Sequence, residues 1–148
     1  MARVEIKMPE SFLQDVSKLA DRTDDILPRV LDVGGKVVLA KVRGNLQAAI
    51  GRGLKYKGRS TGQLAAALGL SSSRLDRDGN HNVKIGFSEN RRGKGGKKVS
   101  NAMLANILEY GKHGQPPKPF LRPARTASRA ACIAAMVAAL ESEVSKIN

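Results

Sequence analysis

Aromatic side chains are scarce in this chain. Its 148 residues include no tryptophan, two tyrosines and three phenylalanines, so aromatic residues make up only 3% of the sequence. Proteins that bind single-stranded nucleic acid stack the bases on aromatic rings. The composition therefore argues against a binder of single-stranded DNA or RNA.

The residues that usually perform catalysis or hold metals are also few. The two histidines, His81 and His113, have no second ligand at the spacing of known metal motifs. The single cysteine, Cys132, has no obvious base and can form no internal disulfide, which fits a reducing cytosol. The stretch 93–97 lacks the spacing of a phosphate-binding loop. We therefore predict a protein that is not an enzyme and binds no metal or cofactor.

Long hydrophobic runs are absent. The longest apolar stretch, Ala130 to Leu140, has 11 residues, whereas about 20 are needed to span a bilayer. No signal peptide is visible at the N-terminus. We expect a soluble protein with no membrane partner, folded as one domain over residues 1–148.

Acidic residues are outnumbered by basic ones, 13 to 26, which gives a formal charge of +13. Residues 1–32 carry a net charge of −2, so the excess lies in residues 33–148. Two glycine-containing segments, 51–60 and 89–99, are predicted to be flexible basic loops that contact an acidic partner or DNA. Their basic residues are Arg52, Lys55, Lys57, Arg59, Arg91, Arg92, Lys94, Lys97 and Lys98.

Hydrophobic periodicity predicts an α+β fold. Residues near 3–8 alternate as a strand does, and segments near 68–75 and 82–88 alternate on either side of turn residues, as in an antiparallel hairpin. A long helix is predicted over about residues 25–50. We expect these strands to form a small antiparallel sheet that packs against this helix and a C-terminal helix.

The two predicted helices have unusual features. Gly34 and Gly35 interrupt the long helix, which indicates a kink or a close crossing. The C-terminal helix is predicted to run from Pro123 to about Lys146, and its arginines lie near the N-terminal end, opposite to the preference of the helix dipole. One stripe of this helix gathers its large apolar residues: Ile133, Val137, Leu140, Val144 and Ile147.

The segment from Ser100 to Ser128 combines a helix, a stiff loop and a second helix start. Ser100 is a good N-cap, and Gly111 is expected to end the first helix. Three prolines within residues 114–119 restrict the loop that follows. We expect this loop to present Phe120 and Leu121 at a defined angle as anchors that dock either in this chain or in a neighbour.

These residues resemble a known signature. Ile107-Leu108-Glu109-Tyr110-Gly111, followed by Pro117-Lys118-Pro119-Phe120-Leu121-Arg122-Pro123-Ala124, is similar to the pattern of the head–tail joining family of tailed bacteriophages, also called neck or tail-completion proteins. Ser60-Thr61-Gly62-Gln63-Leu64 and the hairpin ending in Val83-Lys84-Ile85-Gly86-Phe87 fit the same family in the same order.

The resemblance implies a structural virion protein. Such a protein forms a homo-oligomeric ring, a hexamer or dodecamer, that joins the portal and connector complex to the tail and lets double-stranded DNA pass through its lumen. It is assembled in the host cytoplasm and contacts other connector and tail proteins. The residues expected at its protein interfaces are Glu109, Tyr110, Pro119, Phe120, Leu121 and Arg122.

The basic composition supports an alternative. A nucleic-acid-binding module of ribosomal or nucleoid type would also have a pI near 10.4 and basic loops. The sequence contains no helix-turn-helix, zinc or aromatic RNA-binding motif. We therefore rank this alternative second.

Overall fold

The computed structural model describes residues 9–50, 62–88, 90–92 and 95–147. The predicted strand at 3–8 and the basic segment 51–60 lie outside these residues. The elements in chain order are α1 (Glu10–Asp21), α2 (Thr23–Ala49), α3 (Gln63–Ala67), β1 (Leu68–Leu70), β2 (Arg74–Leu75), β3 (His81–Asn82), β4 (Ile85–Phe87), β5 (Asn90–Arg92), β6 (Lys98–Ser100), α4 (Asn101–Tyr110) and α5 (Leu121–Ser145).

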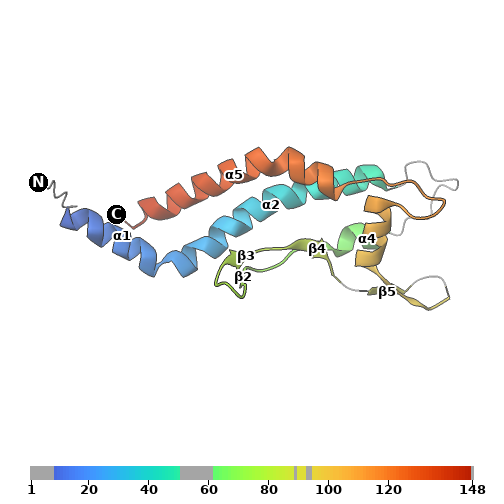
Figure 1. Cartoon of the computed structure of the whole chain (residues 1–148), viewed down its shortest axis with the longest axis horizontal. Coiled ribbons are helices and arrows are strands. Elements are labelled where there is room, and N and C mark those ends of the chain that lie inside the picture. The colour runs from blue at the N-terminus through green and yellow to red at the C-terminus, as the bar shows by residue number, and fades with distance from the viewer. Residues whose placement is uncertain (1–8, 51–61, 89, 93–94, 148) are drawn as a thin grey trace, which may run out of the picture.

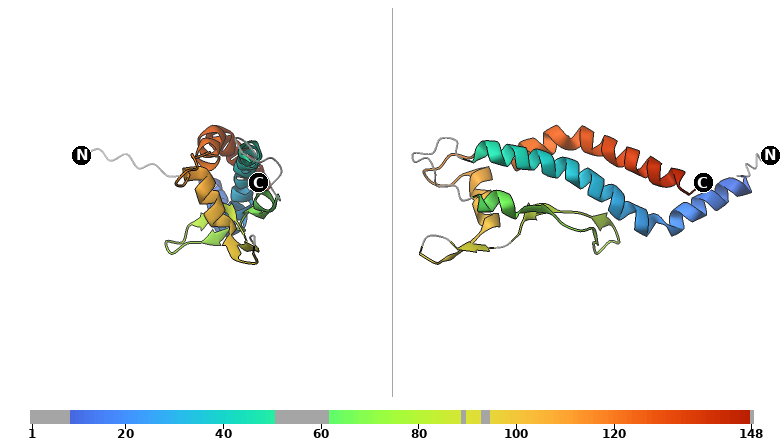
Figure 2. Two further views of the ribbon diagram at one scale, coloured as in Figure 1. Left: turned by 90° about the vertical axis from the view of Figure 1, so that its right-hand side faces the viewer. Right: turned by 180° about the vertical axis from the view of Figure 1, so that it is seen from behind.

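Two long helices form the body of an elongated molecule. Helices α2 and α5 run side by side in opposite directions, and β1 to β4 lie on the other side of α2 (Figures 1 and 2). Helix α4 stands near one end, where α2 finishes and α5 begins, and α1 lies at the opposite end. The class is therefore α+β, with a long helix and a C-terminal helix as predicted.

Two adjacent glycines let α2 approach partners on both sides. A Cβ atom on Gly34 would lie 2.5 Å from Met136 Cγ of α5. A Cβ atom on Gly35 would lie 2.7 Å from Leu70 Cδ1 of β1. Both glycines are buried inside a continuous helix, so the close crossing expected from the sequence is confirmed.

Among the described residues, the strands pair in three two-stranded antiparallel ribbons rather than in one sheet. Pairing of β1 with β4 and of β2 with β3 forms the predicted hairpin, with Leu70 opposite Ile85. At its turn, the Asp76 carboxylate accepts hydrogen bonds from the backbone N–H groups of Asp78 and Asn80. This local hydrogen bonding explains why the turn was recognisable from its residues.

The predicted basic loop at 89–99 contains regular structure. Asn90–Arg92 pairs with Lys98–Ser100, so Arg91 and Arg92 lie on a strand and Lys98 begins the returning strand. The prediction of a bare loop was therefore wrong at both ends of this segment. Backbone pairing supplies the hydrogen bonds that the segment's composition did not suggest.

The core lies where α2, α4, β1 and α5 converge. Its most buried members include Leu46 of α2, Ala105 of α4, Phe120 at the N-cap of α5, and Ala124 of α5. Ile85 and Phe87 of the hairpin pack against it while remaining partly exposed. The hairpin is covered by α2, whereas α5 lies on the opposite side of α2 (Figure 2).

Helix α5 differs from the prediction in two ways. It begins at Leu121, two residues before Pro123, because another helix caps its N-terminus, as described below. Its buried residues are Ala124 and Ser128, whereas three residues of the predicted stripe, Ile133, Val137 and Leu140, are exposed. Met136 and Cys132 of α5 lie against Gly34 of α2 instead. None of the helices in the described residues is long and apolar enough to cross a membrane.

The two glycine environments of α2 predict opposite effects of one substitution. Gly34→Leu is expected to lower the free energy of unfolding by about 2 kcal/mol, because the side chain has no room against Met136. Gly44→Leu is the matched control, since a Cβ there meets no atom within 4 Å. It should raise stability by about 0.5–1 kcal/mol through better helix propensity. Urea unfolding measures both, and a stabilised Gly34→Leu variant would contradict the packing described.

Candidate functional site

Helices α4 and α5 are joined by a tightly bonded turn, which we call the elbow (residues 109–123). Gly111 ends α4 with φ of 78°, and a Cβ there would lie 2.8 Å from the Gln115 carbonyl oxygen. Lys112 and Gln115 each donate a backbone N–H to the other's carbonyl, and Lys118 N–H donates to the Leu108 carbonyl at 2.7 Å. Position 111 requires glycine, because only a residue without a side chain tolerates both the positive φ and the close contact.

The Glu109 carboxylate is the centre of the elbow. Oε2 accepts hydrogen bonds from the backbone N–H groups of Phe120 at 2.7 Å and Leu121 at 2.8 Å, and Oε1 accepts one from Arg122 at 2.9 Å. The first N–H groups of a helix have no partner within the helix, and Phe120 at the N-cap position provides no side-chain acceptor. A side chain of α4 therefore caps α5.

Glu109 is buried, with only 4% of its surface exposed. Burial acts to raise the pKa of Glu109, but hydrogen bonds from the backbone of Leu121, Arg122 and Phe120, together with the Arg122 charge, lower it below its ordinary value. The positive end of the α5 dipole also favours an anion at this position. Glu109 is therefore charged at neutral pH, and both oxygens of its carboxylate accept hydrogen bonds from this chain.

Phe120 is the second fixed point of the elbow. Its side chain is 0% exposed, and its ring makes an edge-on contact with Phe87, with centroids 6.1 Å apart. Its carbonyl accepts a hydrogen bond from Asn45 Nδ2 of α2 at 3.3 Å. The sequence left open whether Phe120 docks in this chain or in a neighbour. The structure places its docking site in this chain.

The other predicted interface residues lie outward from these two anchors. Tyr110 is 77% exposed, next to the buried Glu109. Pro119 and Arg122 are exposed, and Leu121 is partly buried. The six predicted residues therefore differ in role. Glu109 and Phe120 hold the elbow in place, whereas Tyr110, Pro119 and Arg122 are exposed to solvent.

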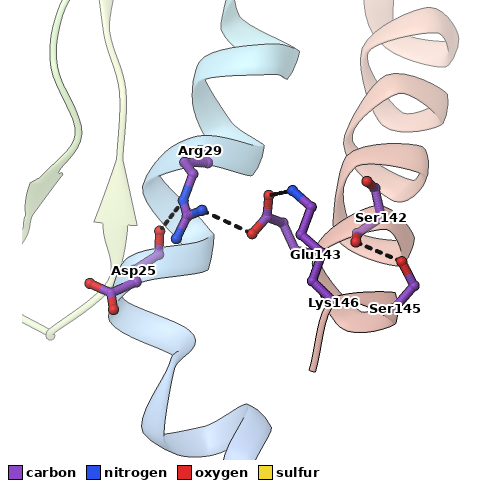
Figure 3. A network of polar contacts seen from close by, with 6 residues as sticks. All are labelled: Asp25, Arg29, Ser142, Glu143, Ser145 and Lys146. Carbon is purple, nitrogen blue, oxygen red and sulfur yellow. Dashed lines mark hydrogen bonds and ion pairs between the residues drawn. The ribbon is translucent and has the colours of Figure 1, made fainter. Parts of the chain in front are cut away.

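The opposite end of the helical pair has its own polar contacts (Figure 3). Arg29 of α2 pairs with Glu143 of α5 at 3.0 Å, and Lys146 Nζ donates to the same carboxylate at 2.8 Å. The Lys146 hydrogen bond and the nearby charges of Arg29 and Lys146 outweigh desolvation and lower the pKa of Glu143. The charge of Glu143, unfavourable so close to a helix C-terminus, is therefore compensated within the chain.

His81 has a structural contact that sequence spacing did not predict. Its Nε2 lies 3.2 Å from Asp24 Oδ1 of α2, and its Nδ1 lies 3.3 Å from Ser73 Oγ. The contact joins β3 to the start of α2. No cluster that could hold a metal ion occurs in the part of the chain that the structure describes.

The structure covers only part of the two basic segments. Arg91, Arg92 and Lys98 lie on β5 and β6, and Lys97 is exposed beside them. The other predicted residues fall outside the described ranges: Arg52, Lys55, Lys57, Arg59 and Lys94. The structure therefore describes four of the nine predicted basic residues, all from the second segment.

The contacts above define a structural elbow in an α+β protein. Comparison with known protein families places this protein among bacteriophage tail components. The family model described as "Bacteriophage HK97-gp10, putative tail-component" matches residues 10–111. The chain belongs to this HK97-gp10-like family. The match begins at α1 and includes Glu109 at the end of α4, but stops before the proline loop. Comparisons with curated proteins and with solved structures gave no significant match.

The cap predicts a large effect from a small change. Glu109→Gln is expected to lower the free energy of unfolding by about 2–3 kcal/mol, because a buried carboxamide replaces one charged acceptor oxygen with an N–H₂ group that cannot accept. Urea unfolding at pH 7 measures this loss. Glu141→Gln, on the exposed side of α5, is the control and should change stability by less than about 0.5 kcal/mol. Equal effects of the two variants would contradict the capping role.

The lowered pKa of Glu109 also predicts a pH dependence. A carboxyl group whose pKa is lower in the folded state stabilises the fold above its unfolded pKa of about 4.3, and this contribution disappears as pH falls through the folded pKa. The stability difference between the native chain and Glu109→Gln should therefore be largest above about pH 5 and shrink in acid. Urea unfolding from pH 7 to pH 3 tests this, and a constant difference would contradict it.

Proposed function

We propose that this protein is a structural component of the virion neck. Copies form a ring that joins the portal and connector complex to the tail, and double-stranded DNA passes through the lumen. The observation that carries the proposal is the family match over residues 10–111 together with the rigid elbow that follows it. The protein would be assembled in the host cytoplasm and then remain in the virion.

The elbow supports a docking role because its shape is set before any partner arrives. Glu109 and Phe120 fix it from inside, so Tyr110, Pro119 and Arg122 are displayed on a stiff base. A rigid displayed residue loses little conformational entropy on binding, and tyrosine and arginine are enriched at the centres of protein interfaces. We propose that this outer face of the elbow contacts a neighbouring connector or tail protein.

The basic segments fit a role in docking better than a role in gripping DNA. Each contact with a phosphate releases counterions and adds affinity, and a ring would multiply that affinity by its number of subunits. A conduit has to let DNA move. We therefore propose that these segments bind acidic surfaces of adjoining ring proteins and contact DNA only weakly and transiently.

The nucleic-acid-binding alternative remains the second candidate because of the high net charge. It predicts submicromolar affinity for duplex DNA with a steep dependence on salt, measured with a purified monomer. The neck proposal predicts weak DNA binding. A DNA titration at two salt concentrations, alongside mass by light scattering, separates the two.

Removing charge from the second basic segment should block assembly without unfolding the protein. Arg91, Arg92, Lys94, Lys97 and Lys98 are changed together to serine, and the purified chain is expected to keep its helical circular dichroism. A phage carrying this variant should produce filled heads that lack tails. The matched control removes five exposed basic residues elsewhere, Lys41, Arg43, Arg74, Arg77 and Lys84. Normal yields of tailed, infectious particles from the first variant would show that the segment is only a solvated surface.

The exposed side of the elbow is tested by Tyr110→Ser. Because the side chain is 77% exposed, the free energy of unfolding should change by less than about 0.5 kcal/mol, while the fraction of heads joined to tails falls. Tyr110→Phe keeps the ring and should largely restore joining. Electron microscopy of lysates counts joined and unjoined particles. Full joining by Tyr110→Ser would remove Tyr110 from the interface.

A further inference from the structure

Helix α1 has little in its own chain to pack on. It has 12 residues and none of them is buried, although isolated helices of this length are barely stable in water. Its N-cap residue, Pro9, makes no side-chain cap hydrogen bond. Figure 1 shows α1 at the end of the molecule, beside the C-terminal end of α5. A partner is therefore needed to explain why this segment carries an amphipathic helix.

The apolar face of α1 is only partly occupied. Phe12, Val16 and Leu19 line an open groove together with Val144 and Ile147 at the end of α5. Phe12, Leu13 and Val16 each expose between 48% and 52% of their surface. Contact with the last turns of its own α5 thus leaves the face accessible to another molecule.

A second uncovered apolar surface runs along the middle of α5. Ile133, Val137 and Leu140 follow one another at spacings of four and three, so they share one side of the helix. Each exposes between 40% and 49% of its surface. They form an apolar ridge, which we define by these three residues. The buried residues of α5 are Ala124 and Ser128, and Met136 lies against Gly34 of α2.

The two surfaces carry opposite charge. Helix α1 contains Glu10, Asp15 and Asp21 against Lys18 alone. The first half of α5, which leads into the ridge, contains Arg122, Arg125 and Arg129 and no acid. Among the described residues, no carboxylate forms an ion pair with Arg125 or Arg129. A second copy of this chain therefore brings an acidic amphipathic helix that matches a basic and apolar one.

We propose that the α5 ridge of one copy docks into the α1 groove of the next. The inference rests on the proposed ring, because a ring needs a head-to-tail contact between two different surfaces, whereas a contact of one surface with itself closes at a dimer. The ridge and the groove are different surfaces, and both are uncovered. Placing the arginines of α5 near the acids of α1 sets the direction of the contact.

A pair of blocking variants tests this contact in solution. Phe12→Asp with Val16→Asp disables the groove, and Ile133→Asp with Val137→Asp disables the ridge. Both double variants alter half-exposed residues, and circular dichroism checks their fold. The native chain is expected to form species larger than a dimer by light scattering, and each double variant alone should be a monomer. Leu75→Asp, a change at an exposed apolar residue of β2, is the control and should leave the native mass unchanged.

Mixing the two variants gives the decisive result. The groove variant still has a ridge and the ridge variant still has a groove, so one intact contact remains, and the mixture should form a complex of one copy of each and stop there. A mixture that stays monomeric overturns the proposal, as does a native chain that is monomeric or closes at a dimer. Assembly of the groove variant to the native mass would assign the α1 face to another partner. Joining of heads to tails by the native chain tests the neck function separately from these masses.

Discussion

The capping of α5 by Glu109 is the interaction on which the rest of the structure depends. One carboxylate accepts three backbone N–H groups that would otherwise lack partners, and it does so from another helix across the proline loop. This sets where α5 starts and its angle to α4. It also draws Phe120 into the core against Phe87. Losing the charge would release the first turn of α5, the loop and the core aromatic pair together.

The start of α5 is thus held at the elbow, and its middle is held by a close helix crossing. Gly34 brings α5 near α2, and Gly35 brings the hairpin near the other side of the same turn. Close approach is possible because a glycine on α2 leaves room for Met136 of α5. Ile133, Val137 and Leu140 form the exposed ridge on another side of α5. An exposed apolar ridge is unfavourable in a protein that stays monomeric, whereas a protein that assembles can bury it in a contact with a partner.

A component of a phage tail must present defined surfaces to several neighbours. This chain displays surfaces at both ends of an elongated body, with the elbow at one end and α1 at the other (Figure 1). The Glu109 cap joins α4 to the start of α5 at one end, and the Arg29–Glu143 pair links α2 to α5 near the other. If the two proposed surfaces dock as inferred above, a rigid body between them would set the distance between the partners that they bind.

The sequence by itself determined the elements whose signals are local. The helix near 25–50, the hairpin around Asp76, the N-cap at Ser100 and the stop at Gly111 each depend on residues a few positions apart, and the structure confirms all four. Family resemblance also followed from short motifs.

Tertiary structure alone decided which groups meet across the chain. Glu109 was read as an interface residue, since no spacing indicates that it caps a helix starting 12 residues later. The sequence groups the large apolar residues of α5 on one stripe, and only the fold shows that three of them are exposed, because periodicity identifies a face but not what covers it. The pairing of β5 with β6 was missed because charged, glycine-rich segments carry no hydrophobic alternation. Each of these outcomes depends on contacts between distant residues, and the sequence pattern does not encode those contacts locally.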